Sequence, residues 1–329
     1  MKKRLSIIIP CFNEEQAIPH FYEVVKKELE AIHQPYELIF IDDGSTDRTN
    51  AIIRNIRDKD PYVALIQFSR NFGKEAAMLA GLRHVKGEYV VIMDADLQHP
   101  PHLLKEMIRI LDTGEYDAVA AYRVRGKKEK ESIFRRLYSR LFYASINRMS
   151  EIKLRNGATD FRMMTHAVVD ALLQLDEYHR FSKGLFEWVG FRTKYIPYEN
   201  VKRVAGRSRW NVFKLVSYAM EGITSFSTVP LRLSMWLGFF SASVSFLYMA
   251  FVIIRKLLDP ESAITGFATT VSLILFLGGL ILIFLGVIGE YLGKVYEEVK
   301  KRPHYIIREW LDSEGVPNGD LDIKGNQKS

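Results

Sequence analysis

Two carboxylates one residue apart, Asp94 and Asp96, give this 329-residue sequence its clearest chemistry, and the amide of Gln98 follows them. They come directly after the apolar run 88–93, which predicts a strand buried on both faces. Open α/β sheets keep their ligands at the carboxyl ends of strands. Carboxylate and amide oxygens are hard ligands suited to Mg²⁺ or Mn²⁺ carrying a diphosphate. We therefore predict a metal site made by Asp96 with help from Asp94 and Gln98; the alternative is a solvated acidic turn.

Other strand ends in the first half of the chain carry polar groups in the same way. The runs 5–10, 36–41 and 63–68 predict buried strands, and each is followed by turn residues or carboxylates. Helical segments alternate with these strands, which predicts an α/β fold with a mostly parallel sheet; the segments are 16–32, 47–57, 74–85 and 101–112. The first strand is followed by neither a G-x-G-x-x-G nor a Walker sequence, so a dinucleotide fold and a phosphate loop are disfavoured.

Four motifs, taken together and in this order, resemble one family of enzymes. They are Pro10–Glu15, Asp42–Asp47, Ser69–Lys74 and Asp94–Gln98. The set is similar to the inverting GT-A glycosyltransferases that charge polyprenyl phosphates, most of all the bactoprenol-phosphate glycosyltransferases, with dolichol-phosphate mannose synthases as relatives. The resemblance covers roughly residues 4–300.

This resemblance implies a GT-A domain that transfers one sugar from a nucleotide sugar to undecaprenyl phosphate, for decoration of a cell-envelope polymer. The donor would be UDP-linked glucose, N-acetylglucosamine or a similar sugar, and the cofactor Mg²⁺ or Mn²⁺. Two alternatives stay open: an enzyme like dolichol-phosphate mannose synthase that uses GDP-mannose, and a non-catalytic membrane subunit that binds lipid phosphate. The acidic motifs weigh against the second, because a binding scaffold needs no metal–diphosphate site. The resemblance leaves a homo-oligomer open.

The resemblance also assigns residues to the donor. Pro10, Phe12, Glu14, Ile41 and Asp43 would line the nucleoside pocket, beside Asp94, Ala95 and Asp96 at the diphosphate. The carboxylate of Asp43 could accept an N–H of the base, whereas the alternative makes Asp43 a turn residue. Cys11 is expected to pack at its strand end and not to act as a nucleophile.

Further residues would act on the sugar and the acceptor. Arg123, after a predicted strand at 118–122, would contact phosphate. Asp160 would orient a sugar hydroxyl or steady the positive charge of the sugar; alternatively, it caps a helix beginning at Phe161.

A basic segment downstream would act on both phosphates. Arg203 and Arg209, on either side of Gly206, would clamp the diphosphate and the lipid phosphate. Arg209 stands where the family has Lys, so the geometry of this contact differs. Alternatively, the segment only binds lipid headgroups.

Two uncharged stretches predict a membrane anchor. Residues 233–254 and 262–289 carry no charge, and about 20 residues span the hydrocarbon core of a bilayer. We predict a catalytic domain at 1–228, an anchor at 229–300 with spans at about 233–254 and 265–289, and a tail at 301–329 that is disordered at its end. Basic amphipathic patterns at about 132–150 and 210–227 predict helices at the membrane interface.

Charge predicts the orientation of the anchor. Five cations follow the second span and two precede the first, which places the domain and the tail in the cytoplasm and the protein in the inner (plasma) membrane; they are Lys294, Lys300, Lys301, Arg302 and Arg308, with Lys214 and Arg232. A single cysteine fits that compartment. The net charge of +7 does not indicate nucleic-acid binding, because no recognition motif accompanies it and the membrane accounts for the arginines.

Overall fold

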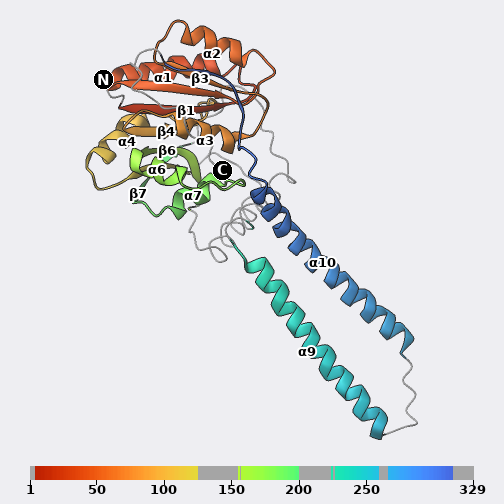
Figure 1. Ribbon diagram of the computed structural model, residues 1–329. Helices are drawn as coiled ribbons and strands as arrows, with labels where there is room; N and C mark the ends of the chain where they lie inside the picture. The colour runs from red at the N-terminus through yellow and green to blue at the C-terminus, as the bar shows by residue number, and fades with distance from the viewer. Residues whose placement is uncertain are drawn as a thin grey trace.

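The computed structural model describes residues 4–124, 155, 157–199, 224, 227–258 and 266–313. In these residues one eight-stranded sheet has the order β7-β5-β6-β4-β1-β2-β3-β8 (Figure 1). The strands are β1 (Leu5–Cys11), β2 (Tyr36–Asp42), β3 (Val63–Phe68), β4 (Tyr89–Ile92), β5 (Ala118–Val124), β6 (Ala158–Thr165), β7 (Thr193–Glu199) and β8 (Ile307–Leu311). The helices are α1 (Ile18–Ile32), α2 (Thr49–Arg57), α3 (Lys74–His84), α4 (Leu103–Asp112), α6 (His166–Leu173), α7 (Ser182–Trp188), α9 (Val229–Leu258) and α10 (Phe267–Val299).

Helices cover both faces of the sheet, so its central strands are apolar on both sides. Along β1, Ile7 and Ile9 face the core formed with α1, α2 and α4, whereas Ile8 faces the core formed with α3, α6 and α7. This is the burial that parallel strands require. Packing against α3 is close, because a Cβ added to Gly81 would lie 2.3 Å from Cγ2 of Ile8. The predicted α/β fold and its four N-terminal helices are confirmed.

The order of the strands creates a place for a ligand. β1 pairs in parallel with β2 on one side and with β4 on the other. The chain goes from β1 to β2 and β3 in one direction and then returns past β1 to form β4. In α/β sheets such a reversal opens a crevice at the carboxyl ends of the strands. The acidic motifs after β2 and β4 lie at this edge.

The second acidic motif lies on a strand. β6 runs antiparallel between β4 and β5, and Asp160 is inside it. The next helix, α6, begins only at His166, so the alternative in which Asp160 caps a helix starting at Phe161 is wrong. Pairing with two neighbouring strands outweighs the helix propensity of the Arg162–Met164 run.

The two long apolar helices, α9 and α10, extend away from the sheet (Figure 1). Val229–Arg255 and Thr270–Val299 are each long and apolar enough to cross a membrane, and their side chains are exposed instead of packed in a protein core. These segments contain the predicted spans 233–254 and 265–289 almost entirely. The predicted interfacial helix 132–150, and all but residues 224 and 227 of the second one, lie outside the described residues.

The chain returns to the sheet after α10, which the sequence analysis did not predict. Residues 301–329 were assigned to a tail, but β8 pairs antiparallel with β3 and places Trp310 opposite Ile66. Arg54 donates two hydrogen bonds to Glu309, one of 3.1 Å, and Lys86 forms an ion pair with Asp312. The helical hairpin therefore begins and ends at the same domain.

Candidate active site

The end of β1 forms the floor of a cavity. The strand continues through Pro10 to Cys11, and the Cys11 carbonyl accepts a hydrogen bond from the Asp43 amide at 2.9 Å. The Cys11 side chain is 2% exposed, and burial raises the pKa of its thiol well above the usual value. A buried, protonated thiol is a poor nucleophile. These features agree with the predicted packing role for Cys11.

Asp43, after β2, anchors the loop that follows β3. Its carboxylate accepts hydrogen bonds from the amides of Phe72 (2.6 Å) and Gly73 (2.9 Å) and from the Asn71 side chain (2.8 Å). Burial raises the pKa of Asp43 to about 6, against the effect of these hydrogen bonds. Gly44 permits the contact, since its φ is +67° and an added Cβ would lie 2.4 Å from the Arg70 backbone. Asp43 therefore both lines the cavity and fixes its neighbouring loop.

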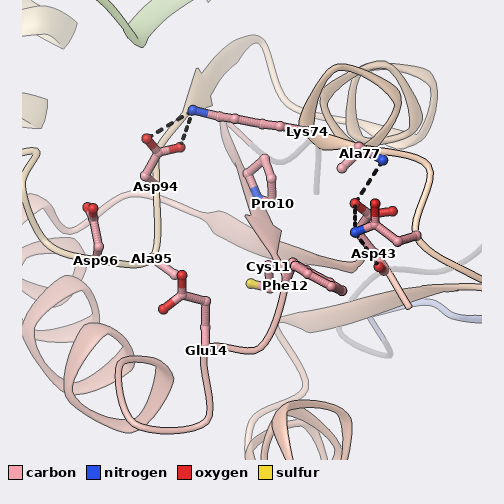
Figure 2. A pocket seen from close by; sticks show the side chains of 12 residues that line it. Pro10, Cys11, Phe12, Glu14, Asp43, Lys74, Ala77, Asp94, Ala95 and Asp96 are labelled. Atoms are coloured by element: carbon pink, nitrogen blue, oxygen red, sulfur yellow. Dashed lines mark hydrogen bonds and ion pairs between the residues drawn. The ribbon is translucent and has the colours of Figure 1, made fainter. Parts of the chain in front are cut away.

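The two carboxylates after β4 face the same cavity (Figure 2). The Asp94 amide donates to Nδ1 of His99 at 3.2 Å, and Oδ1 of Asp96 accepts from the amide of Gln98 at 3.1 Å. The ring of His99 stacks on Phe161 at 5.1 Å, and burial lowers its pKa, so it is neutral at pH 7. His99 thus supports the turn that presents Asp94. The Gln98 side chain does not line the cavity, and Gln98 contacts Asp96 through this backbone hydrogen bond.

Lys74, the first residue of α3, connects the two acidic motifs. Its Nζ lies 2.7 Å from Oδ1 of Asp94 and 2.7 Å from Oδ2 of Asp160. Burial alone would raise the pKa of both carboxyls, but the charge of Lys74 holds each below its usual range. Asp160 is therefore ionised at neutral pH. Lys74 stands in a motif that carried the family resemblance, although no role was predicted for it.

The cavity has a volume of about 370 Å³, at the lower end of the range for small-molecule sites. Seven of the eight predicted donor residues line it, and Ile41 is the exception, because its side chain is fully buried in the core beside α3. The lining consists of Pro10, Cys11, Phe12, Glu14, Asp43, Asn71, Gly73, Lys74, Ala77, Asp94, Ala95 and Asp96.

Of the three predicted arginines, Arg123 lies in the described part of the chain, and it does not line this cavity. Arg123 is exposed at the end of β5, where its amide bonds to the Gly157 carbonyl at 2.9 Å, and it is not in the lining. Arg203 and Arg209 lie outside the described residues. The structure therefore assembles the predicted donor site and leaves the acceptor clamp a prediction.

The sequence matches two family models. Glycosyl transferase family 2 matches residues 6–173, and the GtrB C-terminal hairpin matches residues 229–295. The chain belongs to glycosyl transferase family 2. The first match contains all but the first residue of β1, the strands β2 to β6 and all the acidic motifs, and the second contains most of α9 and α10. The predicted GT-A type of α/β fold is thereby confirmed, and the protein is a glycosyltransferase.

Relatives of this glycosyltransferase are similar over almost their whole length. The Bacillus subtilis protein CsbB is 46% identical over 325 residues, which are 99% of this chain and 96% of CsbB. A prophage-derived bactoprenol glucosyl transferase of Shigella flexneri is 42% identical over 93% of this chain and 97% of its own. The crystal structure of glucosyl-3-phosphoglycerate synthase from Mycobacterium tuberculosis with UDP overlaps 68% of this chain and 78% of its own at a TM-score of 0.43 and 21% identity.

Proposed function

We propose that this glycosyltransferase moves a single glucose, or a similar sugar, from its UDP derivative to undecaprenyl phosphate. The observation that carries the proposal is the 42% identity, over 93% of the chain, to an enzyme named as a bactoprenol glucosyl transferase. A match of 305 residues is long enough to span both the domain that contains the cavity and the helical hairpin. The product, a lipid-linked sugar, would serve the decoration of a cell-envelope polymer.

A divalent cation fits the acidic side of the cavity. Asp94 and Asp96 supply hard oxygen ligands there, which suit Mg²⁺ or Mn²⁺. No group of three or more His, Cys, Asp or Glu side chains that could hold a metal occurs in the described part of the chain. Two protein ligands suit a cation that is also bound by a diphosphate. When bound, it would supply Lewis-acid stabilisation of the leaving diphosphate.

The acceptor needs little help from a base. A phosphate monoester has a second pKa of around 6 and is largely a dianion at neutral pH. Asp160, held ionised by Lys74, is therefore assigned to stabilising positive charge on the sugar and not to removing a proton. An acceptor oxygen that attacks from the face opposite the diphosphate would invert the anomeric carbon. Positioning of two anionic groups is then the main task of the protein.

The hairpin would hold the catalytic domain at the lipid acceptor. We propose that α9 and α10 span the inner membrane, with the domain and the C-terminus in the cytoplasm. The excess of cations flanking the hairpin on the domain side supports this orientation. The return of the chain to β8 after α10 supports a hairpin whose C-terminal end lies on the side of the domain.

The test is a panel of donors. The purified protein in lipid nanodiscs would be incubated with a short polyprenyl phosphate, Mn²⁺ and one donor at a time: UDP-glucose, UDP-galactose, UDP-N-acetylglucosamine or GDP-mannose. The mass of the lipid product would be measured by mass spectrometry. We expect one sugar residue added to the lipid phosphate from a UDP-sugar. Transfer from GDP-mannose alone would contradict the nucleotide assignment, and binding of the lipid without any transfer would indicate a non-catalytic subunit.

A further inference from the structure

Lys74 lies between carboxylates from two different strands. Its Nζ is 2.7 and 2.9 Å from the two oxygens of Asp94 and 2.7 Å from Oδ2 of Asp160. Figure 2 shows the Lys74 side chain extending from α3 across the top of the cavity to Asp94. One ammonium group therefore pairs with a carboxylate from each acidic motif and offsets part of their negative charge.

The sheet forces the two carboxylates together. β4 and β6 are antiparallel, with Val91 opposite Met163 and Ile92 opposite Arg162. Asp94 lies two residues beyond the end of β4, and Asp160 lies two residues before Arg162 on β6, so both carboxylates come just past this pairing. Two carboxylates that share one site repel each other. A cation between them reduces that repulsion.

The position of Lys74 has no explanation in the stability of its own helix. Lys74 is the first residue of α3, where the helix dipole disfavours a positive charge. Its ammonium group instead forms ion pairs with Asp94 and Asp160. Its backbone directly follows the Asn71–Gly73 loop that Asp43 anchors. The side chain is 40% exposed in the wall of the cavity, so it has room to move.

We propose that Lys74 is a positioning residue, an internal counter-ion that holds Asp94 and Asp160 in register and yields Asp94 to the divalent cation of the donor. The proposal rests on the metal-dependent function proposed above. Lys74 and the metal compete for Asp94, while Asp160 keeps Lys74 beside the sugar site. Donor binding is thereby coupled to the loop that precedes Lys74.

Removal of the charge should then have two opposite effects. Lys74→Met keeps the length of the side chain but removes the charge that competes with the metal for Asp94. Mn²⁺ alone should then bind at least about tenfold more tightly, which is the smallest effect expected for the loss of one charge-assisted contact. Turnover should fall at least about tenfold, because Asp94 and Asp160 lose their shared partner. A lysine with a merely structural role would not strengthen metal binding when replaced.

The experiment measures free Mn²⁺ by electron paramagnetic resonance during titration of the full-length protein, without nucleotide. Lys74→Arg, which keeps the charge, should bind Mn²⁺ like the wild type. Lys26→Met is the matched control, because Lys26 pairs with Asp60 at 3.0 Å outside the cavity, and it should leave Mn²⁺ affinity and turnover unchanged. If Lys74→Met does not fold, Lys74→Gln takes its place.

An unchanged or weaker Mn²⁺ affinity in a folded Lys74→Met protein would overturn the inference, as would an equal gain in Lys26→Met. Sugar transfer is assayed separately, so the two proposals can fail independently. Tighter Mn²⁺ binding without transfer by the wild type would contradict the proposed function and leave the counter-ion role supported. Normal transfer with no change in Mn²⁺ affinity would contradict only the counter-ion role.

Discussion

Asn in place of Asp43 should weaken nucleotide binding without unfolding the protein. The carboxylate accepts three hydrogen bonds from the Asn71–Gly73 loop, and an asparagine would turn its NH₂ group toward at least one of these donors. A lost hydrogen bond to a charged group costs roughly 1.5–3 kcal/mol. However, the pKa of Asp43 is raised to about 6 from 3.8 in spite of these hydrogen bonds, so the buried, ionised carboxylate carries a net cost of about 3 kcal/mol at neutral pH. An uncharged asparagine avoids this cost, which offsets the lost hydrogen bonds, so the free energy of unfolding should not fall.

The effects do not cancel for the ligand, because the freed loop forms one wall of the cavity. We expect Asp43→Asn to weaken UDP binding by about ten- to a hundredfold, measured by calorimetry, with a Tm within a few degrees of the wild type. Asp60→Asn is the control. Asp60 is also buried, but Lys26, Tyr22 and Tyr62 hydrogen-bond it outside the cavity, and despite burial they lower its pKa.

Asp60→Asn should therefore lower the Tm and leave UDP binding unchanged. If Asp43→Asn binds UDP normally, the loop is not part of the donor site. If it lowers the Tm as much as Asp60→Asn does, the cancellation of burial against hydrogen bonding is wrong.

Three further substitutions test the site and the fold. Asp96→Asn should lower kcat by about 10²- to 10³-fold with an unchanged Tm, and near-normal turnover in excess chelator would refute metal dependence. Glu75 accepts hydrogen bonds from Ser182, and burial raises its pKa to about 7 from 4.5. The ionised form is disfavoured in the folded protein, so the contribution of Glu75 to stability falls as the pH rises through this range. Between pH 5 and 8 the Tm of the wild type should therefore decrease more than the Tm of Glu75→Gln. Glu309→Arg should lower the Tm by only a few degrees, because the ion pair that it replaces, with Arg54, is partly exposed. Adding Arg54→Glu should restore the Tm, and a failure to restore it would show that other contacts alone hold β8.

The elements that could be predicted from the sequence are those with a local signal. The sequence predicts a helix at 16–32, and α1 is Ile18–Ile32. The central strands are continuous apolar runs, which predict strands buried on both faces. Turn residues at their ends then indicated which edge of the sheet carries the ligand. The residues of the donor site came from the family resemblance, and the motifs that carry it lie at the ends of strands in the same sheet.

The elements that the sequence could not indicate depend on distant partners. β8 has five residues and pairs with β3 only after the chain has passed through the hairpin, so no local pattern distinguishes it from a charged tail. Arg162–Met164 suits a helix but lies between two strands. The contacts of Lys74 with Asp94 and Asp160 join residues 20 and 86 positions apart.

The placement of the nucleotide diphosphate beside Asp94 and Asp96 is tested most directly by a crystal structure with UDP and Mn²⁺, using anomalous diffraction to locate the manganese. We expect one anomalous peak within bonding distance of a carboxylate of Asp96 or Asp94, with UDP in the cavity lined by Phe12 and Asp43. A peak at other residues, or UDP bound outside this cavity, would contradict the proposed site and the mechanism built on it.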